Sequence, residues 1–112
     1  MARVGEIRRG DCVFVRNENA VGSEIRKDRK AIVVSRNACC RNSHTIQVVY
    51  LTRQLSRKAP YHVKLDDGRI ALCEQLYTVD ISRVEYTGPK LQPEEMAKIG
   101  KAIAYQLDLE RL

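Results

Sequence analysis

Short apolar segments alternate with polar segments along most of the chain, and this pattern predicts its elements. β-Branched residues or alternating apolar positions favour strands at residues 12–15, 31–35, 45–52, 61–65 and 69–79. The polar segments between them lack apolar periodicity and are expected to be loops. Asp66-Asp67-Gly68, before the last of these strands, is a hairpin signal. The sequence therefore predicts a mainly β fold.

The end of the chain has a helical period instead. Pro93 suits the first position of a helix, and the acidic residues after it suit the positive helix end. An apolar face with helical spacing is formed by Met96, Ile99, Ile103 and Leu107. We expect an amphipathic helix over residues 93–108 and a short helical turn at 80–83 capped by Asp80. Five or six short strands and this helix predict a small barrel with a packed helix, in a single domain spanning residues 1–112.

Positive charge is concentrated in the first half of the sequence. Residues 1–58 contain 13 Lys and Arg against 5 Asp and Glu, whereas residues 59–112 contain 7 against 9. This asymmetry favours a polyanionic partner; a basic surface that only keeps the protein soluble is the alternative. No apolar segment approaches the roughly 18 residues of a membrane span, and no signal-peptide pattern is present. We expect a cytoplasmic protein without membrane contact.

The cysteines give little evidence of chemistry. Cys12 and Cys73 lie in apolar strand patterns and are expected to be small core residues with reduced thiols. Cys39 and Cys40 with His44 form only a weak metal-binding pattern, because zinc sites usually pair their ligands at short, regular spacing. Neither a metal ion nor another cofactor is expected.

A cluster of basic residues precedes the second predicted strand. It consists of Arg26, Lys27, Arg29 and Lys30. Charged loop residues are usually solvated, but so many beside a buried strand also suit an anion-binding site. The residue pattern alone leaves both interpretations open.

The order of several short motifs is more informative than any one of them. They are Arg9-Gly10-Asp11, Gly22-Ser23-Glu24, Arg29 ahead of the segment AIVVS, Thr52 ending a strand, His62-Val63, Cys73-Glu74-Gln75, Thr78-Val79-Asp80 with Arg83, and a helix opened by Pro93-Glu94-Glu95. In this order the chain resembles the MazF/PemK family, the ribonuclease toxins of bacterial toxin–antitoxin pairs. The resemblance covers nearly the whole chain.

The resemblance implies a fold, an activity and a set of residues. The implied fold is an SH3-like small barrel with a C-terminal amphipathic helix, assembled as a homodimer. The implied activity is sequence-preferring, metal-independent cleavage of single-stranded mRNA by 2′-OH attack, which stops translation and growth. The implied protein partner is a cognate antitoxin with an acidic, disordered tail. The implied catalytic residues are Arg29 and Thr52, and the implied RNA-binding residues are Ser23, Glu24, Gln75 and Thr78.

Three differences from the family pattern keep other functions open. Proline usually follows the arginine, where this chain has Lys30; residues 16–20 lack the usual acidic-apolar-proline stretch; and residues 72–74 lack an arginine and an aspartate that act in one branch. The alternatives are a non-catalytic barrel that binds RNA or protein, and an inactive family member. The presence of both Arg29 and Thr52 favours catalysis, because binding alone would not require the pair.

Overall fold

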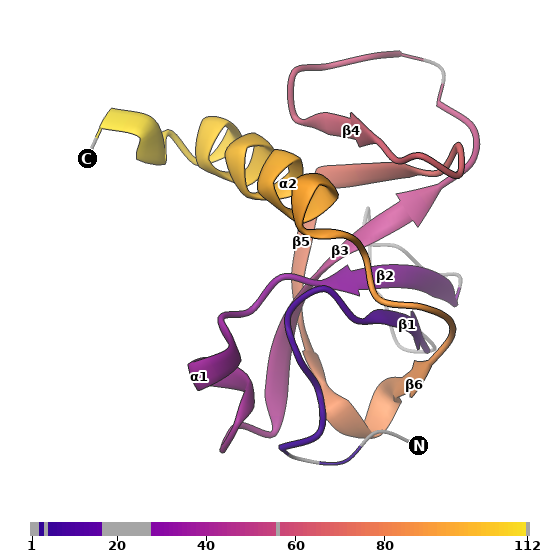
Figure 1. Ribbon diagram of the computed structural model, residues 1–112, viewed down its shortest axis with the longest axis vertical. Coiled ribbons are helices and arrows are strands. Elements are labelled where there is room, and N and C mark those ends of the chain that lie inside the picture. The colour runs from indigo at the N-terminus through magenta and orange to yellow at the C-terminus, as the bar shows by residue number, and fades with distance from the viewer. Residues whose placement is uncertain (1–2, 4, 17–27, 56, 112) are drawn as a thin grey trace, which may run out of the picture.

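Six strands form one antiparallel sheet in the computed structural model, which describes residues 3, 5–16, 28–55 and 57–111 (Figure 1). The strands are β1 (Cys12–Val15), β2 (Arg29–Val33), β3 (Thr45–Thr52), β4 (His62–Lys64), β5 (Ile70–Asp80) and β6 (Val84–Tyr86). Their order in the sheet is β4-β5-β3-β2-β1-β6. Within the described residues β4 and β6 are the two edges, so the small barrel predicted from the sequence is present but open.

Two α-helices and two short 3-10 helices complete the fold of the described residues. They are α1 (Asn37–Cys40), η1 (Ile81–Arg83), α2 (Pro93–Gln106) and η2 (Leu109–Arg111). Pro93 occupies the start of α2 as predicted. Asp80 caps η1 by accepting a 2.9 Å hydrogen bond from the backbone N–H of Ser82. Among the described residues no helix is long and apolar enough to cross a membrane.

The sheet separates two hydrophobic clusters. On one face, here called the helix face, α2 packs over the strands; this cluster includes Ile32, Val49, Leu51, Cys73, Met96, Ile99 and Ala102. The opposite face, here called the barrel face, carries the second cluster, which includes Val13, Val15, Ala31, Val33, Val48, Tyr50 and Val84. Side chains alternate between the two faces along the strands, as the period of two requires, except at residues 73–75 of β5. Both faces of the central strands are therefore buried.

Strand β5 is bent where it passes β3. Val49 pairs with Leu76, but the next residue, Tyr50, pairs with Leu72. Residues 73–75 are therefore extra on the β5 side, and such an irregularity bends the strand and changes the direction of its side chains. The first part of β5 also pairs with β4, whereas the second part continues along β3.

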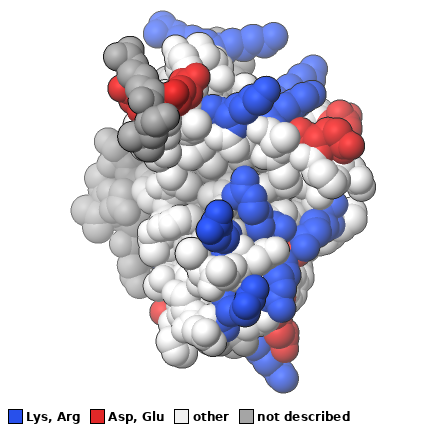
Figure 2. All heavy atoms as spheres, turned by 60° about the vertical axis from the view of Figure 1, so that its left-hand side comes forward, with Lys and Arg blue, Asp and Glu red and all other residues white. Residues whose placement is uncertain are grey.

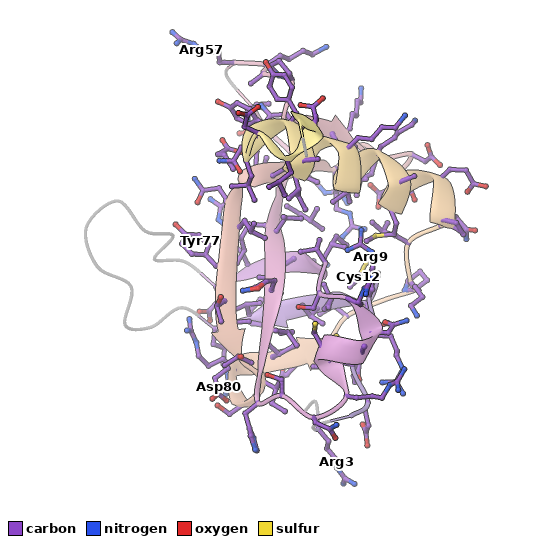
Figure 3. The ribbon with its side chains drawn as sticks, turned by 90° about the vertical axis from the view of Figure 1, so that its left-hand side faces the viewer. Arg3, Arg9, Cys12, Arg57, Tyr77 and Asp80 are labelled. Atoms are coloured by element: carbon purple, nitrogen blue, oxygen red, sulfur yellow. The ribbon has the colours of Figure 1, made fainter. Side chains whose placement is uncertain are left out.

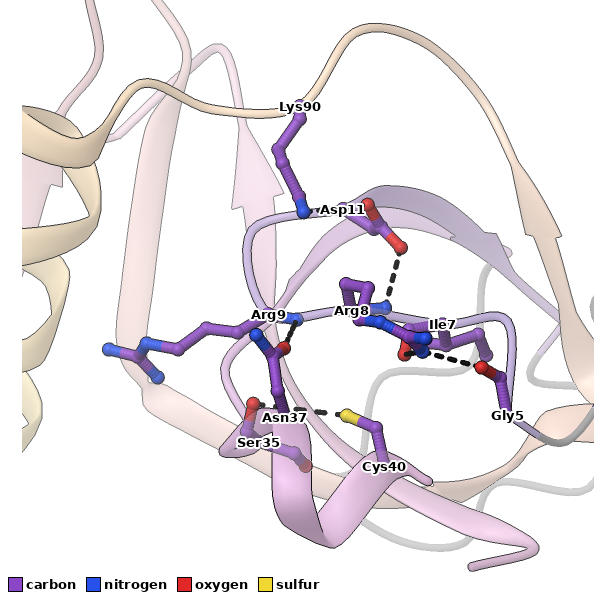
Figure 4. A network of polar contacts seen from close by, with 9 residues as sticks. All are labelled: Gly5, Ile7, Arg8, Arg9, Asp11, Ser35, Asn37, Cys40 and Lys90. Atoms are coloured by element: carbon purple, nitrogen blue, oxygen red, sulfur yellow. Dashed lines mark hydrogen bonds and ion pairs between the residues drawn. The ribbon is translucent and has the colours of Figure 1, made fainter. Parts of the chain in front are cut away.

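The Arg9-Gly10-Asp11 motif ties the start of β1 to the end of β2 and to α1 (Figure 4). The Gly10 N–H donates to the Val33 carbonyl at 2.8 Å, and Gly10 has a φ of +95°, which favours glycine. The Arg9 N–H donates to Asn37 Oδ1 at 2.8 Å. Asp11 accepts from the backbone N–H of Arg8 at 2.7 Å. The motif is thus structural, because it fixes the strands that carry the candidate site.

Several boundaries differ from the sequence predictions. Strand β2 begins at Arg29, two residues before the predicted start, because Arg29 and Lys30 pair with Val15 and Phe14 of β1. Strand β6 and helix α1 were not predicted, since both are short and mostly polar or exposed. Helix α2 ends at Gln106, because Asp108 has a left-handed φ of 58°.

Candidate active site

Arg29 and Thr52 lie at neighbouring ends of adjacent strands. Arg29 is the first residue of β2, and Thr52 is the last residue of β3. The ladder between these strands pairs Ala31 with Tyr50. Continuing that register by two residues sets Arg29 opposite Thr52. Because side chains alternate, both belong to the barrel face, on the same side as Ala31 and Tyr50.

Arg29 is half-buried and has unused hydrogen-bonding capacity. Its Nε is fully buried and has no hydrogen-bond partner among the described residues. A buried donor without a partner costs about 1–3 kcal/mol, so an acceptor brought by a ligand would be favoured there. The guanidinium presents a fork that matches phosphate oxygens. Arg29 is therefore suited to bind a phosphate.

Gln75 has an unpaired hydrogen-bond acceptor, whereas Arg29 has an unpaired donor. Its Oε1 is buried and also lacks a partner in the described part of the chain. Gln75 precedes Tyr77 by two residues along β5, and the Tyr77 ring lies 5.4 Å from the Tyr50 ring. Gln75 belongs to the irregular segment of β5, residues 73–75, and lies next to the part of the strand that carries Tyr77. An unpaired amide oxygen there is suited to accept a hydrogen bond from a nucleobase or a ribose.

The Thr52 hydroxyl takes part in a local turn. Its Oγ1 donates to the Gln54 carbonyl at 3.0 Å, and the Gln54 N–H approaches the same oxygen at 3.3 Å. A hydroxyl has one donor and two acceptor positions, so a phosphate that takes its hydrogen must replace the bond to Gln54. Thr52 is half-buried at the strand end, where this exchange with solvent or ligand is possible.

The pairing with β1 shows what holds Arg29 in place without the usual proline. Lys30 lies inside β2, opposite Phe14, and Arg29 lies opposite Val15. A proline would fix the backbone through its ring. Here the antiparallel ladder fixes the direction of the backbone instead, so Lys30 does not leave Arg29 unsupported.

Thr78 lies away from the pair formed by Arg29 and Thr52. It is opposite Gln47, five residues before Thr52 along β3, and the two side chains are hydrogen-bonded. At about 3.3 Å per residue, this is roughly 16 Å from Thr52. Gln47 alternates with Val48, so Thr78 also belongs to the helix face. Figure 3 shows the neighbouring Tyr77 and Asp80 along the late part of β5. Ser23 and Glu24, predicted to bind RNA, lie outside the described residues.

The described residues give little support to catalysis by a cysteine thiol or by a bound metal ion. Burial raises the pKa of the Cys73 thiol to about 12, and burial also raises the pKa of Cys40. Both thiols therefore stay protonated and weakly nucleophilic. All four cysteines are free, and Cys12 and Cys73 are buried as predicted. No three His, Cys, Asp or Glu side chains of the described residues gather to hold a metal ion.

A pocket of about 580 Å³ lies elsewhere on the molecule. Its lining is formed by Tyr61, Glu74, Tyr105, Gln106, Asp108 and Glu110. Three carboxylates make it a poor match for a polyanion, and it contains none of the predicted site residues. Nearby, the His62 Nε2 lies 3.0 Å from the Glu74 carboxylate. His62 is the first residue of β4, and the contact with Glu74 holds its side chain in place, so we interpret it as a structural residue.

Basic side chains extend beyond the candidate site. Figure 2 shows Lys and Arg spread over the face that it displays, with Asp and Glu in fewer places. The net charge of +6 therefore acts over the surface and attracts polyanions at long range. The pair formed by Arg29 and Thr52 on the barrel face differs from this general positive charge, because it places two side chains at one point.

Comparison with known protein families shows the family of this chain. The model of PemK-like, MazF-like toxins of type II toxin–antitoxin systems matches residues 8–107 of the chain. The chain belongs to this family. The resemblance found in the order of the motifs is confirmed.

Curated relatives cover the whole length of the match. The endoribonuclease EndoA of Bacillus subtilis is 32% identical over 111 residues, which span 92% of this chain and 96% of the relative. The endoribonuclease MazF of Staphylococcus saprophyticus is 27% identical and covers 95% of both chains. The PemK/MazF match is therefore not limited to a single motif.

Solved structures of MazF toxins have the same fold. MazF from Deinococcus radiodurans matches with a TM-score of 0.79 at 19% identity, over 91% of this chain and 96% of that chain. A mycobacterial endoribonuclease in complex with its cognate antitoxin matches with a TM-score of 0.76 at 23% identity, over 92% and 96%. These neighbours confirm the predicted fold, a small barrel with a C-terminal helix.

Proposed function

We propose that this chain is an endoribonuclease toxin that cleaves single-stranded mRNA at preferred sequences in the cytoplasm, without a metal ion. The observation that carries the proposal is the placement of Arg29 and Thr52 at adjacent strand ends on one face. The names of the EndoA and MazF relatives support the same activity. Cleavage of mRNA would stop translation and growth.

The proposed reaction uses a nucleophile that the substrate already contains. The ribose 2′-oxygen attacks the adjacent phosphorus and loses its proton, and the bond from phosphorus to the 5′-oxygen breaks. The leaving 5′-oxygen takes up a proton, so the products are a 2′,3′-cyclic phosphate and a 5′-hydroxyl. The protein has to align these atoms and stabilise the negative charge that develops on the phosphoryl oxygens.

Arg29 would provide the charge stabilisation. A guanidinium is a poor proton acceptor but can donate two parallel hydrogen bonds to phosphate oxygens. The Thr52 hydroxyl would add one hydrogen bond at the same phosphate. Gln75 would contact a neighbouring base or ribose, and Ser23 and Glu24 would complete the RNA contacts. Thr78, on the helix face, would contact RNA only away from the scissile phosphate.

The test of the proposed activity is incubation of the pure protein with a long single-stranded RNA, followed by mapping of the new ends. We expect cuts at a short recurring sequence, and no cuts when the same sequence is held in a duplex. Protein carrying Arg29→Ala and Thr52→Ala together is the matched control and should leave the RNA intact. RNA binding without cleavage by the unaltered protein would instead support the non-catalytic barrel.

The proposal includes a homodimer and an antitoxin. Tyr105, Leu107 and Leu109 are large apolar side chains with 45–50% of their surface exposed near the C-terminal end, and burial between two chains would stabilise them. We expect a mass of twice 12.8 kDa by sedimentation at micromolar concentration. A strictly monomeric mass would contradict the dimer.

The antitoxin is expected to inhibit by occupying the RNA site with an acidic segment. Opposite charge would draw such a disordered segment to the basic first half of the chain. Co-purification with the protein encoded by the neighbouring reading frame should therefore abolish RNA cleavage. Full cleavage by the saturated complex would rule out this mode of inhibition.

A further inference from the structure

Lys64 lies in the same cross-strand row as the two proposed catalytic residues. It is the last residue of the edge strand β4 and pairs with Ile70 of β5. Ile70 in turn pairs with Thr52 of β3. Continuing the register between β2 and β3 adds Arg29 to this row. Residues directly opposite one another across strands project to the same face, so Lys64 also belongs to the barrel face.

The spacing of the strands sets the distances along the row. Adjacent strand backbones lie about 4.8 Å apart. The Cα atom of Lys64 is therefore roughly 10 Å from that of Thr52, and the Cα atom of Arg29 is about 5 Å from Thr52 on the other side. Ile70, between Lys64 and Thr52, is half-buried and offers an apolar surface. A polynucleotide that crosses the strands along this row would meet two cationic side chains separated by a hydroxyl and an apolar residue.

Lys64 is available for a ligand, whereas its basic neighbour in the hairpin is not. The Lys64 side chain is exposed, and none of the ion pairs found among the described residues involves it. Arg69 is held by Asp67, with the Arg69 Nε at 2.8 Å from the Asp67 carboxylate. Lys64 is therefore a cation of the edge strand β4 that can reach a phosphate with its flexible stem.

We propose that Lys64 binds the phosphate next to the scissile one and so sets the path of the RNA across the strands. This inference rests on the proposed endoribonuclease function and adds a residue that the motifs did not indicate. Lys64 positions the RNA and does not take part in bond breaking. It contributes to affinity through charge, independently of the bases.

The first test measures how binding depends on salt. The probe is a short RNA that contains the mapped cut site, with one deoxyribose 5′ of the cut so that it binds without being cleaved. Each phosphate contact to a single strand contributes about 0.7 to the slope of log affinity against log salt. Lys64→Gln should lower that slope by about 0.7 and weaken binding equally for different base sequences. The matched control is Lys98→Gln, because Lys98 is exposed on α2, which covers the opposite face; it should leave the slope unchanged.

The second test identifies the phosphate. One phosphate at a time in the probe is replaced by a neutral methylphosphonate, and binding is measured with the unaltered protein and with Lys64→Gln. At the phosphate next to the cut, the replacement should weaken binding by the unaltered protein several-fold and have little further effect on the variant, since interacting groups are non-additive. Cleavage at saturating all-ribose RNA should keep its rate in Lys64→Gln, while the KM rises.

The outcomes separate the two proposals. Cleavage by the unaltered protein, with a salt slope for Lys64→Gln equal to that of Lys98→Gln, would overturn the role of Lys64 and leave the proposed function standing. Additive effects of Lys64→Gln and every methylphosphonate would do the same. Failure of the unaltered protein to cleave the all-ribose RNA would overturn the function and this inference with it.

Discussion

Replacing Arg29 with alanine is expected to lower the rate of RNA cleavage by about 10²- to 10³-fold and to leave the protein folded. A preorganised donor to the charge of the transition state is typically worth this much. The fold should survive, because the buried Nε of Arg29 makes no hydrogen bond within the described residues that the substitution would remove. The measurement is single-turnover cleavage of an RNA with one mapped cut site, with circular dichroism to check the fold.

Conservative variants make this prediction sharper. Arg29→Lys keeps the charge but loses the two-pronged geometry, so it should cleave at an intermediate rate. Thr52→Ala should lose cleavage, while Thr52→Ser, which keeps the hydroxyl, should retain most of it. The contacts of Thr52 with Gln54 are local and partly exposed, so neither change should unfold the protein. A folded Arg29→Ala or Thr52→Ala protein with unchanged cleavage would move the reaction to another part of the molecule.

Replacing one ribose by deoxyribose on the 5′ side of the cut phosphate should abolish cleavage at that position. In the proposed reaction the 2′-oxygen is the attacking atom, so its removal leaves no nucleophile. Attack by water would need an activating group, and the described residues contain no cluster of three His, Cys, Asp or Glu side chains suited to hold a metal ion. The measurement compares this substrate with the all-ribose RNA under the same conditions.

Binding provides the control for that substitution. Contacts with the RNA are spread over several nucleotides, so the affinity of the substituted strand should be nearly unchanged. Deoxyribose at a position two nucleotides away should leave cleavage intact. Efficient cutting of the strand that lacks the single 2′-oxygen would show that another nucleophile acts.

The strands that the sequence predicted best are those in which apolar alternation and pairing coincide. Residues 12–15 and 45–52 were predicted with the boundaries of β1 and β3, since their buried positions alternate or run without interruption. The start of β2 was placed too late because Arg29 and Lys30 are charged. Their strand conformation depends on pairing with β1, and no local property of two basic residues reveals that pairing.

The residues of the candidate site were predicted only in part, because their positions also depend on strand pairing. The motif order indicated Arg29 and Thr52, which the structure places on one face, and Gln75, which lies in the irregular segment of β5. It also indicated Thr78, which belongs to the other face. Lys64 was not indicated at all. Its place in the row depends on the registers of four strands whose order in the sheet, β4-β5-β3-β2, differs from their order along the chain, and on the bend of β5. Such long-range pairing cannot be derived from the residue pattern of one segment.

The chemical nature of the ends made from a long single-stranded RNA in the presence of EDTA tests the account most directly. The ends can be determined by ligation and phosphatase treatment, with Arg29→Ala protein incubated in parallel. We expect undiminished cleavage in EDTA, with a 2′,3′-cyclic phosphate on one fragment and a 5′-hydroxyl on the other. A requirement for added divalent metal, or fragments that carry a 5′-phosphate, would contradict metal-independent attack by the 2′-hydroxyl at Arg29 and Thr52.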